Sequence, residues 1–430
     1  MSNEEIEQIA FDSGFFKRKS GKIQAPDFLL YFCLQSLDGT VSYNDLASKI
    51  EAQTGVNVSR QAYHQRMGEE CNAFFMKILE TVLLPKNQHE AIGPLITSKT
   101  YKRILVQDST IIRLPLRLFD IFSGVKNAHS AVCNARIQGV YDLISRKFIK
   151  FSIDSYSKND LSVTLDIPVE KGDLILRDRG YFTIDAMKKL KNKGVDSIFR
   201  YKYKTSFFDI NNKNEIDLLD ILKKEGSIDQ EVLAGVKEKY KVRIVAVPAT
   251  EEVGNIRRMK AKKESKSKKT PSKEYLELMS WSIFVITIKT KEVTFEMIFR
   301  LYELRWRIEN IFKTWKSNFN FDKIHNVSEQ QLGVLLRARL IMIVVLNHYI
   351  FNPLSHIIMK NSDKKLSMMK FMHYISINKN VIIKVLDLKN ISNKTIQALI
   401  KYCTYDKRNR KNFEEKEREA ILKLNNIAVI

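Results

Sequence analysis

The spacing of apolar and polar residues changes twice along the chain, and each change marks a different expected region. Residues 1–95 show the three-to-four-residue spacing of amphipathic helices. From Tyr101 to about residue 202, short apolar runs typical of strands alternate with helical segments, and after Val327 the spacing is helical to the end. The pattern therefore predicts a mixed α/β core that is flanked by helical N- and C-terminal regions.

Two apolar runs in the expected core end in a carboxylate: RILVQD ends at Asp108, and DLILRD ends at Asp178. Both runs predict buried strands. The other expected core elements are a hairpin over Ala135–Ile153 that turns at Ser145–Arg146, helices over Leu161–Val169 and Ile184–Lys193, and strands over Val195–Lys202 and Trp281–Ile288.

Residues 203–280 interrupt this core. Lys241–Ala249 has the pattern of a strand, and the basic run Arg257–Lys269 predicts a flexible loop. Such a loop is either a solubilising linker or, as we favour given the charge of the chain, a contact to a nucleic-acid backbone. The expected regions are a helical N-terminal region (1–95), a core in two pieces (100–202 and 281–325), a β-rich insertion with a basic loop (203–280) and a helical C-terminal region (326–430).

The composition of the chain indicates the kind of partner that it binds. The 430 residues carry a net charge of +23 and are 44% hydrophobic, which suits a globular protein with a sizeable core. A balance this basic implies a polyanionic partner, most simply nucleic acid, with an anionic membrane surface as the alternative. The apolar stretch Leu340–Leu346 is shorter than the roughly 20 residues of a membrane-spanning helix, so no span is expected.

The termini and cysteines indicate a compartment. The acidic N-terminus MSNEEIEQIAFDS lacks the apolar segment of a signal peptide. The four cysteines are scattered without a CxxC pair, which suits a reducing environment and argues against a zinc site or a disulfide framework. We therefore expect a cytoplasmic protein.

A helix-turn-helix is expected near the N-terminus. A helix over Tyr43–Gln53, a break at Gly55 and a second helix capped by Ser59 fit this motif. The second helix is basic, which favours DNA contact; two ordinary packed helices are the alternative.

The segment 302–316, YELRWRIENIFKTWK, predicts a helix with two distinct stripes. Tyr302, Arg305, Glu309, Lys313 and Lys316 are three or four residues apart, so one helix face carries a carboxylate among phosphate-binding side chains. A solvated amphipathic helix with Glu–Lys pairs is the alternative. The adjoining stripe is apolar and can face a core: Leu301, Leu304, Ile308, Ile311, Phe312 and Trp315.

Three carboxylates can meet in such a fold. Asp108 and Asp178 end strands, Glu309 lies on the helix after the last strand, and strand ends converge at the rim of an α/β sheet. Three acids together repel one another unless a cation binds, and oxygen ligands select Mg²⁺ or Mn²⁺. Two such ions suit in-line displacement at a phosphodiester. For any single Asp at a strand end, a turn or helix cap is the alternative.

The motifs QDST at 107–110, RDRGYF at 177–182 and Y-x2-R-x3-E-x6-K from Tyr302 to Lys316 resemble bacterial DDE transposases of insertion sequences, the group called insertion-sequence family four. The resemblance covers roughly residues 100–350. It implies a ribonuclease-H-like core with a β-rich insertion before the last strand. It also implies Asp108, Asp178 and Glu309 as catalytic metal ligands, and Tyr302, Arg305, Lys316 and, less firmly, Lys313 as contacts to DNA phosphates.

Two further residues follow from the resemblance. Relatives that form a DNA hairpin place an aromatic residue just before the last core strand to receive a flipped base, and Trp281 falls there; a buried core tryptophan is the alternative. Arg200 follows the strand after Asp178 and could touch DNA, or be an ordinary exposed strand-end arginine.

The expected function is that of a transposase using Mg²⁺, with Mn²⁺ as a substitute, on double-stranded DNA at transposon ends and at the target. Joining two ends implies at least a dimer on DNA. A hairpin intermediate is the expected route. The alternatives are a metal-dependent nuclease of the same fold and a non-catalytic DNA-binding protein derived from a transposase.

Overall fold

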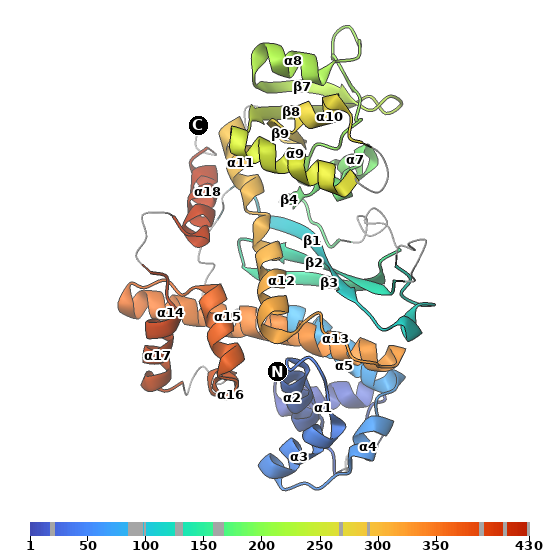
Figure 1. Cartoon of the computed structure of the whole chain (residues 1–430). Coiled ribbons are helices and arrows are strands. Elements are labelled where there is room, and N and C mark those ends of the chain that lie inside the picture. Colours follow the sequence, from blue (N-terminus) through green and yellow to red (C-terminus); the bar gives the residue numbers. More distant parts are fainter. Residues whose placement is uncertain are drawn as a thin grey trace.

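The computed structural model has a central sheet with helical regions at one end and along one side (Figure 1). The mixed α/β core with helical flanks is therefore confirmed. The expected helix over Leu161–Val169 lies almost wholly outside the described part of the chain. The structure describes residues 1–17, 22–84, 98, 100–124, 132–157, 167–265, 270–289, 293–386, 391–406 and 411–427.

The nine strands form one sheet in the order β3-β2-β1-β4-β5-β9-β8-β7-β6. β1 is antiparallel to β2 and parallel to β4, and β4 is parallel to β5. This arrangement is the one expected of a ribonuclease-H-like core. The strands are β1 (Arg103–Arg113), β2 (Asn134–Asp142), β3 (Lys147–Ser155), β4 (Asp173–Arg177), β5 (Asp196–Arg200), β6 (Phe207–Phe208), β7 (Ile228–Ala234), β8 (Tyr240–Pro248) and β9 (Trp281–Ile286).

The strands of segment 203–280 extend the core sheet. β9 is antiparallel both to β5 and to β8, so hydrogen bonding runs unbroken from the core into β7 and β6. Three helices lie beside these strands: α8 (Leu218–Glu225), α9 (Glu251–Ser265) and α10 (Lys273–Leu278). The prediction of a loop over Arg257–Lys269 is wrong for its described part, because residues up to Ser265 are helical.

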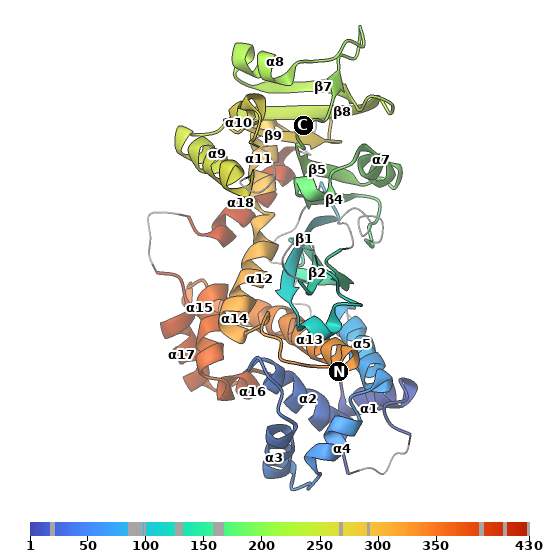
Figure 2. The same cartoon turned by 45° about the vertical axis from the view of Figure 1, so that its right-hand side comes forward.

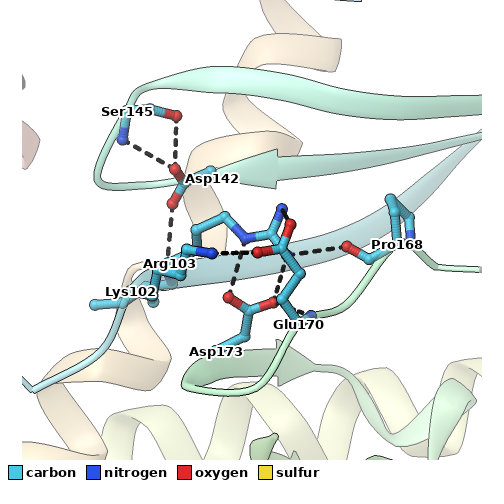
Figure 3. A network of polar contacts seen from close by, with 8 residues as sticks. Lys102, Arg103, Asp142, Ser145, Pro168, Glu170 and Asp173 are labelled. Atoms are coloured by element: carbon cyan, nitrogen blue, oxygen red, sulfur yellow. Dashed lines mark hydrogen bonds and ion pairs between the residues drawn. The ribbon is translucent and has the colours of Figure 1, made fainter. Parts of the chain in front are cut away.

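A polar network fixes the pairing of β1 with β4 at the beginning of both strands (Figure 3). Arg103 and Asp173 are register partners, and the guanidinium donates to both carboxylate oxygens at 2.9 and 2.6 Å. Asp173 is fully buried. At the end of β2, the Asp142 carboxylate accepts the backbone N–H groups of Ile104 and Ser145. Bidentate, buried contacts of this kind are strongly directional, so they hold one register.

The N-terminal region contains five described helices, and the expected helix pair is among them. Gly55 ends the first helix of that pair in a left-handed conformation (φ 73°), and the Ser59 hydroxyl caps the second. Tyr63 on the second helix is fully buried, so this helix packs against the rest of the region through that side chain. The five are α1 (Asn3–Asp12), α2 (Ala25–Ser36), α3 (Tyr43–Thr54), α4 (Arg60–Gln65) and α5 (Glu69–Leu83).

The C-terminal region is helical, as predicted, and begins with a long helical run over Glu329–Ser362. By length and composition this run could span a membrane, whereas the stretch Leu340–Leu346 alone is too short. However, 83% of the most apolar window of the run is buried inside the protein. Its elements are α13 (Glu329–Val344), the π-helical η3 (Val345–Phe351) and α14 (Asn352–Ser362). They are followed by α15 (Met368–Ile377), α16 (Asn380–Leu386), α17 (Asn393–Cys403) and α18 (Phe413–Ile427).

The predicted helix over 302–316 is two helices, α11 (Phe295–Glu303) and α12 (Trp306–Phe319). At the junction the N–H groups of Leu304 and Arg305 bond to carbonyls three residues back, which tightens the turn. The apolar stripe faces the core as predicted, with all six of its residues buried. Two 3₁₀ turns and one helix complete the core: η1 (Leu116–Leu118), η2 (Arg179–Tyr181) and α7 (Ile184–Asn192).

Candidate active site

The register of β1 and β4 brings two of the predicted acids level with each other. Paired residues run from Arg103 with Asp173 to Val106 with Leu176, so the same register two residues further on aligns Asp108 with Asp178. The strands are parallel, and their pairing ends near these acids, at the carboxyl edge of β4, where α/β sites form. The prediction that Asp108 ends its strand is wrong, because β1 continues for five residues to Arg113 and stays paired there with β2. Asp178 directly follows β4 and precedes the turn η2.

A glycine allows the helix that carries Glu309 to approach this edge. Gly139 on β2 is the register partner of Asp108. A Cβ at position 139 would lie 3.1 Å from the Phe312 ring and 3.2 Å from the rings of Phe148 and Phe151. The missing side chain therefore lets the Phe312 ring, one turn after Glu309, pack directly on the sheet. Figures 1 and 2 show α12 running across β1 and β2.

Arg305 lies between two of the acids. Its Nη1 is 3.3 Å from Asp108 Oδ2 and 2.5 Å from Glu309 Oε1, and its side chain is only 8% exposed. Tyr302 donates its hydroxyl to Asp178 Oδ1 at 3.2 Å. The tight turn between α11 and α12 thus directs the Tyr302 and Arg305 side chains toward the three carboxylates. The structure brings Asp108, Asp178, Glu309, Tyr302 and Arg305 together in one cluster.

Burial and like charge govern the ionisation of Asp108. Burial raises the pKa of its carboxyl to about 7; the Arg305 guanidinium opposes this rise, and the Glu309 and Asp178 carboxylates add to it. The backbone N–H of Ser109 donates to Asp108 Oδ1 at 2.8 Å. The cluster therefore holds more negative charge than its one central cation neutralises.

The donor set suits a divalent cation. Three carboxylates supply the hard oxygen ligands that Mg²⁺ and Mn²⁺ prefer. Burial raises the pKa of Asp108, and the Glu309 and Asp178 carboxylates add to the rise, so a bound cation would stabilise the ionised form of Asp108. As the side chains stand, no three His, Cys, Asp or Glu groups in the described ranges are gathered as a metal site. Arg305 Nη1 bridges two of the acids at the place where such ligands would have to meet.

The two lysines of the predicted stripe differ in their surroundings. Lys316 is half-buried and donates its ammonium to the backbone carbonyl of Ile111 on β1 at 2.8 Å. Burial lowers the pKa of Lys316. Lys313 is exposed to solvent on the same helix. The stripe is therefore divided into a charged cluster at the acids and two lysines further along α12.

Trp281 is held by packing at the start of β9. Its indole N–H donates to the carbonyl of Gly226 at 2.8 Å, and its ring packs partly buried against the second hydrophobic cluster of the protein. These contacts favour the packing alternative for Trp281. Arg200, the last residue of β5, is close enough to influence the pKa values of Tyr302 and Arg257, so it borders the acidic cluster.

Sequence reasoning missed two residues at this site. Trp306, the first residue of α12, is 54% exposed beside Arg305, whose guanidinium carbon lies 5.9 Å from its ring. A tryptophan this exposed beside half-buried acids indicates a functional surface, but its exposure is known only from the structure. Gly139 interrupts an alternating strand, and this is a signal for close packing that can be read from the sequence.

A ribonuclease-H-like sheet with acidic side chains gathered at one edge is typical of enzymes that act on nucleic acids. Residues 100–345, more than half of the chain, match the family model described as "Transposase DDE domain". The chain therefore belongs to the family of DDE transposases, as its motifs predicted.

The relatives agree with this assignment. The transposase for insertion sequence element IS1151 of Clostridium perfringens is 28% identical over 390 residues, which cover 85% of this chain and 82% of that protein. The transposase for IS231E of Bacillus thuringiensis subsp. finitimus is 27% identical over 388 residues, covering 84% and 80%. A solved piggyBac transposase synaptic complex with hairpin DNA is a more distant likeness, with a TM-score of 0.43 and 11% identity over 95% of this chain and 84% of that chain.

The raised pKa of Asp108 predicts a pH dependence of stability in metal-free protein. Between about pH 4 and pH 7 the folded protein binds more protons at Asp108 than the unfolded chain, so stability falls as pH rises through this range. Asp108→Asn removes the effect. We expect it to raise the free energy of unfolding at pH 8 by about 1–4 kcal/mol, with no difference near pH 4.

Urea unfolding in EDTA at both pH values measures this difference. Asp185→Asn is the matched control, because Asp185 is an exposed carboxylate on α7 that pairs with Lys189. Asp108→Asn protein that is equally or less stable at pH 8 would contradict the prediction.

Proposed function

We propose that this protein excises and integrates its own insertion sequence by metal-dependent cleavage and transfer of DNA strands. The observation that carries the proposal is the convergence of Asp108, Asp178 and Glu309 around Arg305 at the carboxyl edge of β1 and β4. We assign the three carboxylates as ligands of Mg²⁺, for which Mn²⁺ substitutes. When bound, the cations supply activation of the attacking oxygen and stabilisation of the leaving oxygen.

Several side chains around the acids contact the DNA in this proposal. Arg305 has donors suited to a two-pronged phosphate contact, and its buried Nε has no hydrogen-bond partner among the described residues. Tyr302, with its hydroxyl at Asp178, borders the same phosphate position. Lys316 and Lys313 continue along α12 and follow the DNA backbone, and Arg200 contacts DNA at the border of the site.

Each chemical step exchanges one P–O bond for another. Water attacks the phosphorus at the transposon end, loses a proton, and displaces the 3′ oxygen as a free 3′-OH. That hydroxyl attacks the opposite strand and gives a hairpin, which a second water reopens. The regenerated 3′-OH finally attacks target DNA and displaces a 3′ oxygen there. No oxidant or reductant is needed.

Double-stranded DNA is the partner at every step. Joining two transposon ends requires at least two copies of the chain on DNA. In the N-terminal region, Arg60, Gln61, His64 and Gln65 on α4 are exposed, and we assign this helix a role in recognising the transposon end. A net charge of +23 supports backbone binding throughout.

The central test is Asp108→Ala with a labelled transposon end and Mg²⁺. We expect strand cleavage to disappear, because one of three metal ligands is lost, and end binding to stay within about twofold, because no phosphate contact is removed. Gel shift and cleavage assays measure the two properties separately. Cleavage near the wild-type rate would exclude the proposed site, and wild-type protein that cleaves but never joins strands would indicate a nuclease.

The phosphate role of Lys316 predicts a change in salt dependence. Lys316→Ala should reduce the slope of log affinity against log salt for end binding by about one unit, since one counterion release is lost. Lys360→Ala, which removes an exposed lysine on α14, should leave the slope unchanged. An unchanged slope in Lys316→Ala would return this lysine to a purely structural contact with Ile111.

Trp281 and Trp306 are the two candidates for stacking against a flipped base in a hairpin route. If Trp281 receives it, Trp281→Ala should preserve the first nick and reduce hairpin yield, because stacking of the base is lost. If Trp281 only packs, the same change should cost about 3–5 kcal/mol of stability and reduce all products alike. Trp306→Ala is the comparison, since its exposed ring can be removed with little effect on folding.

Nick yield, hairpin yield and melting temperature of both variants decide the assignment. Hairpin loss in Trp306→Ala alone would move the role from Trp281 to Trp306. Normal hairpin yield in both variants would argue against stacking on either ring.

A further inference from the structure

Arg307 lies between Arg305 and Glu309 in the sequence but faces away from them. Two residues along an α-helix correspond to about 200°, so Arg307 is on the side of α12 opposite to the acidic cluster. Its side chain is 5% exposed. A cation buried this deeply requires compensating charge, and none of the residues assigned to the reaction supplies it.

The compensating charge comes from α18, the last helix of the chain. Arg307 Nη2 is 3.7 Å from Glu414 Oε1, and its guanidinium lies 5.4 Å from the ring of Phe413. Glu417, one turn further along α18, contributes the largest attractive charge to Arg307. Glu417 is fully buried, and Glu414 is nearly so.

The same helix also holds two other parts of the catalytic core. Arg146, at the β2–β3 turn, bonds to Glu417 at 2.7 Å and adopts the left-handed conformation (φ 54°). Near the other end of α18, the carbonyl of Leu424 accepts the hydroxyl of Thr100, three residues before β1. Figures 1 and 2 show α18 beside α11. It lies outside residues 100–345, which match the family model.

The network is sensitive to the loss of either carboxylate. Arg307 Nε, Glu414 Oε1 and Glu417 Oε1 are buried and have no hydrogen-bond partner among the described residues, whereas the other carboxylate oxygen of Glu417 accepts from Arg146. Removing one partner of a buried charge group leaves the other uncompensated, and this is far more disruptive than losing an exposed ion pair. Loss of Glu417 would leave Arg146 at the β2–β3 turn and Arg307 on α12 without part of their compensating charge. Of these two elements, α12 carries a site residue close by, because Arg307 and Glu309 are two residues apart.

We propose that Glu414 and Glu417 are positioning residues, which set the orientation of α12 through Arg307 and thereby place Glu309 against Asp108. The C-terminal helix α18 then contributes to the geometry of the catalytic core. This inference rests on the proposed function of Glu309.

The test uses the full chain with Glu417→Gln and Glu414→Gln. Glu419→Gln is the matched control, since Glu419 is on the same helix but pairs with Lys411 at the surface. We expect the single-turnover cleavage rate constant at saturating transposon end and Mg²⁺ to fall at least tenfold in Glu417→Gln and less in Glu414→Gln. End affinity should stay within twofold, and Glu419→Gln should match the wild type.

The rate constant separates positioning from folding. A variant that merely unfolds in part cleaves with a smaller amplitude at an unchanged rate constant, whereas a misplaced Glu309 lowers the rate constant of molecules that are folded and DNA-bound. Glu417→Asp, which retains the charge, should recover part of the rate. Hydrogen exchange should become faster in peptides of α12 in Glu417→Gln while β1 and β4 keep their protection.

Three results would overturn the proposal. The first is a rate constant within twofold of the wild type, and the second is a loss confined to amplitude. The third is that neither glutamine variant folds, which would assign the network to general stability. If wild-type protein fails to cleave at all, the proposed function fails, and hydrogen exchange of α12 still decides whether α18 orients it.

Discussion

The site depends on the register between β1 and β4. Side chains alternate between the two faces of a strand, so a slip of one residue would send Asp108 and Asp178 to opposite faces of the sheet. The bidentate pair of Arg103 and Asp173 opposes such a slip, because only one register lets the guanidinium meet both carboxylate oxygens. The structure therefore places a strong polar contact where the pairing of β1 with β4 begins, and the two acids just beyond the point where this pairing ends.

A second constraint is the cost of gathering like charges under partial burial. Burial raises the pKa of Asp108, and Arg305 offsets the repulsion by bridging to Glu309. This arrangement requires the break between α11 and α12, because the turn directs Tyr302 and Arg305 to the acids. On the far side of α12, Arg307 adds a buried cation, which α18 neutralises. The charges on the two faces of one helix are thus balanced by different parts of the chain.

The features that could be predicted from the sequence are those that depend on the local pattern of residues. Alternation and apolar runs identified the core strands, and residue spacing identified the charged and apolar stripes around Glu309. Spacing could not predict the helix break, because Leu304 and Arg305 keep helical dihedrals and differ only in hydrogen bonding. The basic run Arg257–Lys269 is helical as far as Ser265 because Ala, Arg, Lys, Glu and Met favour helices, although its charge favours a loop.

Other features depend on contacts between residues far apart in the sequence. The indole of Trp281 donates to the carbonyl of Gly226, the residue that follows α8, and the partner of Glu417 is Arg146, at a hairpin turn. Neither pairing leaves a periodic signal. The approach of Phe312 to Gly139 produces a weak signal in the sequence. A glycine weakens a strand, so its presence within one indicates a position where close packing needs the space.

The central position of β9 has a consequence for the order of folding. β9 covers the edge of β5, yet it is made only after the whole segment 203–280. Until then a growing chain exposes the open edge of β5, which can pair with other chains. Long sequence separation also slows such pairing. The segment that interrupts the core therefore lengthens the time during which this edge is exposed. Its strands β6–β8 are complete before β9 is made, so β9 can pair with β8 on one side as it pairs with β5 on the other.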